Sequence, residues 1–141
     1  MAINKQIHLV RQMVEGIIWI EANFGLLHRA ILNLIINAVK YGPESSNVTI
    51  QLTLNTANNQ AIFSVTDHGP GIPIEEQGKL FKRFSRMKGQ DQVSEGAGLG
   101  LYFVRTVIEK HHGSVQVSSD LGEPTIFSIY LPIIGFQSHQ D

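Results

Sequence analysis

The chain has 141 residues, a formal net charge of -1 at pH 7 and no cysteine. Its length suits one domain that buries about two thirds of the unfolded-chain surface in a single core. The near-zero charge gives no electrostatic footprint for nucleic acid, and the absence of cysteine excludes disulfides and thiolate metal sites. No apolar run is long enough for a membrane span and no signal peptide opens the sequence, so we expect a cytoplasmic chain.

In chain order, the first predicted elements are two strands and a helix. Alternation of apolar and polar residues predicts a strand over 6–13, and a short apolar run at 16–20 suits a second. With Asn23 as N-cap, apolar residues three and four positions apart then predict a helix over 24–41. A Gly-Pro pair follows and ends it.

The remaining elements follow the same two periodicities. We expect strands at 47–55 and 60–67 joined by a hairpin turn, helices at 74–84 and 97–112, and final strands at 114–119 and 125–131. This order predicts an α/β fold: a two-layer sandwich with a mixed sheet of about five strands and three helices on one face. The core would span about 6–132, with a C-terminal tail at 133–141.

Two asparagines on the first predicted helix are not explained by packing. Asn33 and Asn37 are four residues apart and share one helix face, which Lys40 and Tyr41 continue. Asparagine is unfavourable within a helix because its amide competes for backbone hydrogen bonds. Either both amides simply face water, or their oxygens bind Mg²⁺ together with phosphate, which Lys40 would also contact.

A second motif, VTDHGPGIP at 65–73, places a carboxylate where a predicted strand ends. Gly69 and Gly71 allow the chain to turn sharply beside Asp67. Taken alone, the motif is compatible with an ordinary tight turn or with a ligand site in which Asp67 accepts a hydrogen bond.

Aromatic and basic residues follow in LFKRF at 80–84. The two phenylalanines are typical of an amphipathic turn that packs on the core. Arg83 and Arg86 are candidates for contact with phosphate or with a partner.

The last helix is preceded by a glycine-rich stretch, SEGAGLGLYFVRTV at 94–107. Glycines 96, 98 and 100 let the backbone approach a ligand without a Cβ in the way. A dinucleotide fingerprint is disfavoured, because the third glycine of GxGxxG would fall at Leu101 and no buried strand precedes the turn. The pattern favours phosphate held by free N–H groups at a helix N-terminus.

Four ordered motifs resemble the N box, first glycine box, F box and second glycine box of the histidine kinase catalytic domain, within the Bergerat-fold ATPase superfamily. They read NLIINAVKY, DHGPGIP, LFKRFSR and GAGLGLYFV. Each motif alone is weak, whereas four in this order with family-like spacing are specific. The resemblance covers about residues 6–132 and implies a single domain with the Bergerat ATP-binding fold.

This resemblance implies ATP and Mg²⁺ as cofactors. Asn37, supported by Asn33, would bind Mg²⁺, and with Lys40 these form the implied catalytic set. Asp67 would accept the exocyclic amine of adenine, and residues 85–97 would form the ATP lid. The implied nucleotide-binding residues are Asn33, Asn37, Lys40, Tyr41, Asp67, Gly69, Gly71, Ile72, Arg83, Phe84, Gly96, Ala97, Gly98, Leu99, Gly100 and Leu101.

The resemblance also implies a reaction and partners. The chain would donate the γ-phosphoryl group of Mg-ATP to a histidine on a separate dimerisation domain, for relay to a response regulator. The resemblance further implies a dimerisation hairpin and a sensor, which we expect to lie outside this sequence. We therefore expect a monomeric fragment of a homodimeric protein, either cytoplasmic or the cytoplasmic part of a membrane-bound sensor, with no nucleic acid partner.

Three positions depart from the family pattern. Ala97 stands where Thr or Ser is usual, His68 where Asn or Thr is usual, and Asn23 where Asp is common. Two rival hypotheses stay open. One is a serine kinase of the anti-sigma type on the same fold, which the F box and the GxGLGL form disfavour. The other is a degenerate nucleotide-binding or interaction module, which Ala97 favours.

Overall fold

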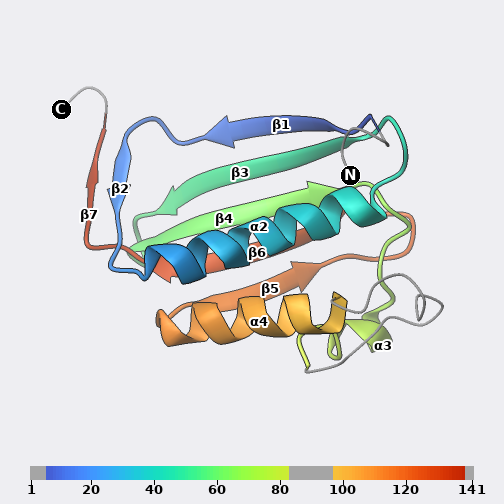
Figure 1. Cartoon of the computed structure of the whole chain (residues 1–141). Helices are drawn as coiled ribbons and strands as arrows, with labels where there is room; N and C mark the ends of the chain where they lie inside the picture. Colours follow the sequence, from blue (N-terminus) through green and yellow to red (C-terminus); the bar gives the residue numbers. More distant parts are fainter. Residues whose placement is uncertain (1–5, 83–96, 139–141) are drawn as a thin grey trace.

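The computed structural model describes residues 6–82 and 97–138, and for residues 97–99 it describes only the helical backbone. Seven strands and three helices follow one another along this part of the chain (Figure 1). Their order is β1 (His8–Met13), β2 (Ile17–Trp19), α2 (Phe24–Tyr41), β3 (Asn47–Asn55), β4 (Gln60–Asp67), α3 (Ile74–Gln77), α4 (Ala97–Lys110), β5 (Ser114–Ser118), β6 (Thr125–Pro132) and β7 (Gly135–Gln137).

Five of the strands form one mixed sheet in the order β1-β3-β4-β6-β5. Strand β1 pairs with β3 in parallel, and the other neighbours are antiparallel. Figure 1 shows α2 and α4 lying across one face of this sheet, with α3 at one end. The predicted two-layer α/β sandwich with a mixed five-stranded sheet is confirmed.

The two faces of the sheet differ because side chains alternate along each strand. On the helix side, Val48, Val65 and Phe127 are buried, and they pack with Leu34 of α2 and Ile108 of α4. On the other side, Ser64 and Ser128 are directly opposite each other, and their hydroxyls are 3.0 Å apart in a hydrogen bond. This alternation of apolar and polar residues is the period-two pattern that the sequence displays.

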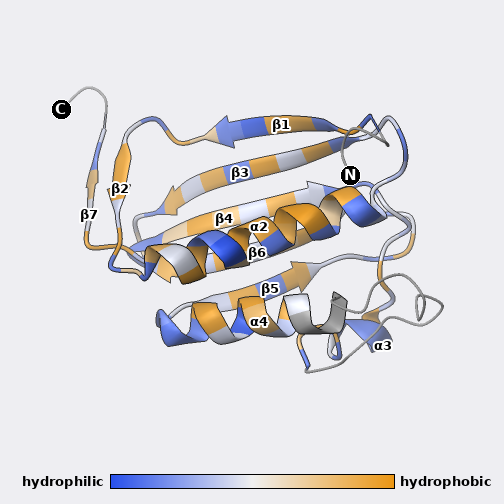
Figure 2. Ribbon diagram, in the orientation of Figure 1, coloured by the Kyte–Doolittle hydropathy of each residue, from blue (hydrophilic) through white to orange (hydrophobic). Residues whose placement is uncertain are grey.

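The helix layer covers the sheet unevenly. Helix α2 packs mainly over β4, and α4 over β5. Leu9 and Met13 of β1 lie on the helix side, since their register partners are Val48 and Leu52, yet they are 50% and 43% exposed. Apolar segments on β1 are visible beyond the two helices in Figure 2.

Two predicted elements differ from the structure. The strand expected at 16–20 is present as β2 but pairs with β7 in a separate two-stranded sheet. Strand β7 lies within the segment expected to be a tail, where Ile133 is buried and the Ile134 N–H donates to the Trp19 carbonyl at 2.8 Å. A three-residue strand is too short to show a period, so the pattern did not predict it.

The second predicted helix is also shorter than expected. Instead of running over 74–84, α3 spans only Ile74–Gln77 and is followed by turns as far as Lys82. Gly78 comes directly after it, and glycine is a poor helix former because its backbone loses the most entropy on ordering.

Helix α4 ends in a Schellman motif that places a histidine in a left-handed conformation. The Gly113 N–H donates to the Ile108 carbonyl at 2.9 Å, and the His112 N–H donates to the Glu109 carbonyl at 3.1 Å. His112 has a φ of 65°, and a Cβ on Gly113 would clash with the Tyr130 carbonyl oxygen. The glycine at this helix end is therefore required by close packing, whereas the left-handed position is occupied by His112.

We expect His112→Gly to stabilise the protein by about 1 kcal/mol, because a non-glycine residue in the left-handed region costs about 1–2 kcal/mol. Urea unfolding of the variant and the wild type would measure the difference. His112→Ala keeps the Cβ and is the matched control, for which we expect no gain. An equal gain in both variants would show that the backbone conformation is not the cause.

Candidate functional site

Helices α2 and α4 run antiparallel, and two contacts set their alignment. At one end, the Asn23 N–H donates to His111 Nε2 at 3.0 Å, while His111 Nδ1 lies 2.7 Å from the Val107 carbonyl oxygen. Further along, the Arg29 guanidinium lies over the Phe103 ring, 4.5 Å from its centroid. The C-terminal end of α2 and the N-terminal end of α4 consequently share one end of the molecule, where α3 also lies (Figure 1).

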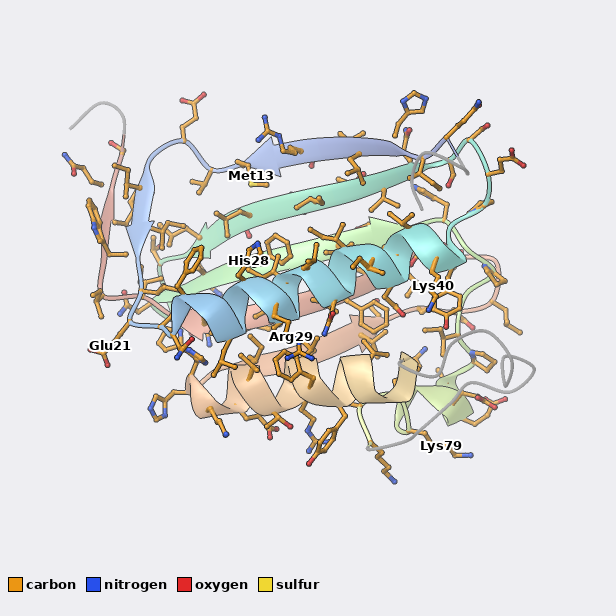
Figure 3. The ribbon with its side chains drawn as sticks, in the orientation of Figure 1. Met13, Glu21, His28, Arg29, Lys40 and Lys79 are labelled. Atoms are coloured by element: carbon orange, nitrogen blue, oxygen red, sulfur yellow. The ribbon has the colours of Figure 1, made fainter. Side chains whose placement is uncertain are left out.

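The predicted asparagine pair follows Arg29 along α2 in steps of four residues. Figure 3 shows Arg29 on the side of α2 that faces α4, with Lys40 near the C-terminal end of the helix. Asn33 and Asn37 are each partly buried, as are Lys40 and Tyr41. Helical spacing therefore places both amides on the α4 side of α2, away from the sheet. Burial also raises the pKa of the Tyr41 hydroxyl.

The side chains of Asn33 and Asn37 suit a hard cation only when a phosphate group is bound beside them. Amide oxygens are neutral donors of the kind that Mg²⁺ accepts beside phosphate oxygens and water. Within the described ranges, no group of three His, Cys, Asp or Glu residues could hold a metal ion.

Asp67 ends β4 with its carboxylate inside the protein. The residue is 3% exposed, and Oδ1 accepts a hydrogen bond from the Gly69 N–H at 2.8 Å. Desolvation raises the pKa of Asp67, while the Gly69 hydrogen bond and the charge of His68 oppose this shift. A buried carboxylate that accepts a single backbone hydrogen bond has capacity to accept a further donor.

The two glycines after Asp67 are required by close contacts. A Cβ on Gly69 would lie 2.7 Å from the Tyr41 carbonyl oxygen and 2.9 Å from Asp67 Oδ1. Gly71 has a φ of +88°, and a Cβ there would clash with the Asp120 carbonyl oxygen. Residues 67–72, here called the Asp67 loop, therefore pack directly against the C-terminal end of α2. This contact brings the asparagine helix and the Asp67 motif together.

The other predicted residues divide into three groups. Ile72 and Leu101 are buried members of the core. Gly100, in the first turn of α4, has open space where a Cβ would be, and Ala97, Gly98 and Leu99 precede it in that turn. Arg83, Arg86, Phe84, Gly96 and the predicted lid up to residue 96 lie outside the described residues.

Sequence reasoning missed a hydrogen-bonded network behind the Asp67 loop. Ser119 Oγ accepts from the Ile72 N–H at 2.9 Å and lies 2.8 Å from Thr125 Oγ1, and Thr125 is the register partner of Asp67. Gln77 Nε2 donates to the carbonyls of Ile72 and Ser119. Ser119 lies more than 40 positions from both Ile72 and Gln77 in the sequence, so no local motif could have revealed their association.

Comparison with protein families gives one match across most of the chain. The model described as "Histidine kinase-, DNA gyrase B-, and HSP90-like ATPase" matches residues 22–134. This range contains α2, the Asp67 loop and α4. No helix of the described ranges is both long enough and apolar enough to cross a membrane.

Curated relatives are sensor kinases of greater length. The adaptive-response sensory kinase SasA of Rippkaea orientalis (strain PCC 8801 / RF-1) is 36% identical over 129 residues, which are 92% of this chain and 32% of the relative. The sensor histidine kinase RppB of Synechocystis sp. (strain ATCC 27184 / PCC 6803 / Kazusa) is 36% identical over 134 residues, or 94% of this chain and 29% of the relative. The chain thus spans about a third of the length of these relatives.

Solved structures share the same fold. The mycobacterial sensor histidine kinase MprB aligns with a TM-score of 0.80 and 29% identity, covering 94% of this chain and 88% of that one. Full-length ShkA in complex with AMPPNP aligns with a TM-score of 0.77 and 28% identity, covering 94% of this chain and 27% of that one. The resemblance to the catalytic ATP-binding domain of sensor histidine kinases is confirmed, and the chain belongs to the family of histidine kinase-, DNA gyrase B-, and HSP90-like ATPases.

Proposed function

We propose that this chain binds Mg-ATP at the end of the molecule where α2, α4 and the Asp67 loop meet, and donates the γ-phosphoryl group to a histidine of a separate domain. The observation that carries the proposal is the buried Asp67 carboxylate, held beside the C-terminal end of α2 by a glycine turn. Full-length ShkA, a structural neighbour of this chain, is in complex with AMPPNP, which supports a nucleotide as the ligand.

Each residue has a distinct role in this proposal. Asp67 Oδ1 is already 2.8 Å from the Gly69 N–H, so the carboxylate is fixed in place to accept the exocyclic amine of adenine. Asn33 and Asn37 would hold Mg²⁺, which neutralises phosphate charge when it is bound. Lys40 would contact phosphate oxygens. The first turn of α4 has N–H groups without partners inside the helix, which suit the same phosphates.

Phosphoryl transfer depends mainly on positioning and charge neutralisation, so this site needs no conspicuous general base. The phosphoacceptor would be a histidine on the dimerisation domain of the same kinase, and a response regulator would receive the phosphoryl group from it. The full-length protein would be a homodimer, and this domain would work in the cytoplasm.

The test is a titration of the purified chain with ATP and GTP, each with and without Mg²⁺, followed by the addition of a histidine-containing dimerisation domain. We expect tighter binding of ATP than of GTP, a further gain with Mg²⁺, and phosphorylation of the added domain on histidine. Absence of nucleotide binding would favour the interaction module. Phosphorylation on serine instead would favour the rival kinase class.

A further inference from the structure

The side-chain amide of Gln77 bridges two backbone carbonyl groups that are far apart in the sequence. Gln77 Nε2 lies 2.8 Å from the Ile72 carbonyl oxygen and 2.7 Å from the Ser119 carbonyl oxygen. An amide nitrogen carries two hydrogens, so it can donate one to each carbonyl. An oxygen in the same place would face two acceptors, and the surroundings therefore fix the orientation of this amide.

These two bonds complete the attachment of the loop that follows Asp67. The Ile72 N–H donates to Ser119 Oγ, so both backbone polar groups of Ile72 are held, one by Ser119 and one by Gln77. Nearby, Gly71 packs against the Asp120 backbone, and the Gly122 N–H donates to the Pro70 carbonyl at 3.4 Å. The end of the loop is thus fixed to the connection between β5 and β6.

The beginning of the loop is attached to the start of β6, where the same connection ends. Asp67 is the register partner of Thr125, the first residue of β6, and Thr125 Oγ1 lies 2.8 Å from Ser119 Oγ. Residues 67–72 therefore span between two fixed points on one segment. Asp67 is the first of these points, and Gly69, whose N–H bonds to the Asp67 carboxylate, lies between the two, so the arrangement of this pair depends on both attachments.

We propose that Gln77 is a positioning residue for the adenine end of the nucleotide site. It holds the loop against the β5–β6 connection so that Asp67 and Gly69 keep the geometry that receives the base, without touching the nucleotide itself. This inference rests on the proposed function. It gives the short helix α3 a role, since Gln77 is the last residue of that helix.

The first test replaces Gln77 with methionine, which has a similar length but no donor. We expect Gln77→Met to weaken the binding of adenosine, ADP and ATP by one common factor of about tenfold, as for the loss of one or two hydrogen bonds. The ratio of ATP affinity to ADP affinity should stay unchanged, because the phosphate end is not altered. Gln51→Met, on the exposed side of β3, is the matched control and should leave all three affinities unchanged.

A second variant adds a pH readout that a merely structural role would not give. In Gln77→Glu, a carboxylate faces two carbonyl oxygens at neutral pH, and the loss of affinity should exceed that of Gln77→Met. Protonation at lower pH supplies one O–H donor, so the affinity relative to the wild type at the same pH should recover. Ser119→Ala removes the acceptor of the Ile72 N–H. It should therefore weaken the binding of adenosine, ADP and ATP by one common factor, as Gln77→Met does.

The outcomes separate this inference from the proposed function. Circular dichroism melting establishes which variants are folded at the titration temperature. If a Gln77 variant is unfolded there, the three ligand affinities of Ser119→Ala test the proposal instead. Unchanged affinities in folded variants, or a change confined to the ATP to ADP ratio, would overturn the positioning role alone. A wild-type chain that binds no adenine nucleotide would overturn the proposed function and the positioning role with it.

Discussion

The Asp67→Asn variant is expected to bind ATP about 10- to 100-fold more weakly than the wild type and yet to unfold at a higher temperature. The affinity falls because the variant replaces a charged acceptor with an amide, and a hydrogen bond to a charged group contributes about 1.5–3 kcal/mol. Stability rises because Asp67, a residue that is 3% exposed, no longer brings a charge that has to be desolvated on folding, while the amide oxygen can still accept the bond from Gly69. Calorimetric titration and thermal melting measure the two effects.

The pH dependence of that stability difference has a definite sign. Burial raises the pKa of Asp67, so the fold disfavours its ionised form. Such a group contributes stability that is present below its unfolded pKa of about 4 and is lost as the pH rises through the raised value. The gap between Asp67→Asn and the wild type should therefore be smallest near pH 4 and widen towards neutral pH. Glu15→Gln, which removes an exposed carboxylate, is the matched control.

For Asn37→Ala, we expect the gain in ATP affinity on adding Mg²⁺ to disappear, while adenosine binding stays unchanged. The amide oxygen of Asn37 is the proposed cation ligand, and the adenine end of the site is formed by a different element. Folding should not suffer, since alanine is favoured over asparagine in a helix by roughly 0.7 kcal/mol. Titrations of ATP and adenosine with and without Mg²⁺ test this.

Two further variants sharpen the test of the magnesium site. Asn33→Ala should give a smaller loss, because Asn33 is proposed only to support Asn37. Asn58→Ala, in the exposed turn between β3 and β4, should behave as the wild type. If Mg²⁺ raises the ATP affinity of Asn37→Ala as much as that of the wild type, Asn33 and Asn37 do not form the metal site.

The fold was predictable where the sequence repeats with a clear period. The bounds expected for the first helix, 24–41, agree with α2, and the strands expected at 47–55 and 60–67 agree with β3 and β4. Asn23 is the N-cap of α2, and its Oδ1 accepts from the Leu26 N–H at 2.9 Å. Elements of three or four residues are too short to show a period. Strand β7 was therefore not predicted, and α3 was predicted to be longer than it is.

The candidate site was predictable in part for a similar reason. Asn37 stands out because asparagine is unfavourable within a helix, whereas Asp67 was singled out because its motif is one of four in a family-like order. Gln77 and Ser119 do not stand out, since a glutamine in a short helix and a serine after a strand are ordinary. Their importance comes from hydrogen bonds between segments that only the folded chain brings together. The assignment of ligands to any of these residues stays a prediction.

The turn between β3 and β4 offers a practical handle for such measurements. Strand β4 carries the chain from this turn to Asp67, and eight residues at about 3.3 Å each place the turn roughly 25 Å from the proposed site. Ala57 is exposed there, and the protein contains no cysteine. A single thiol introduced by Ala57→Cys would therefore be unique, and it would tether the protein to a sensor surface with the nucleotide end directed into solution.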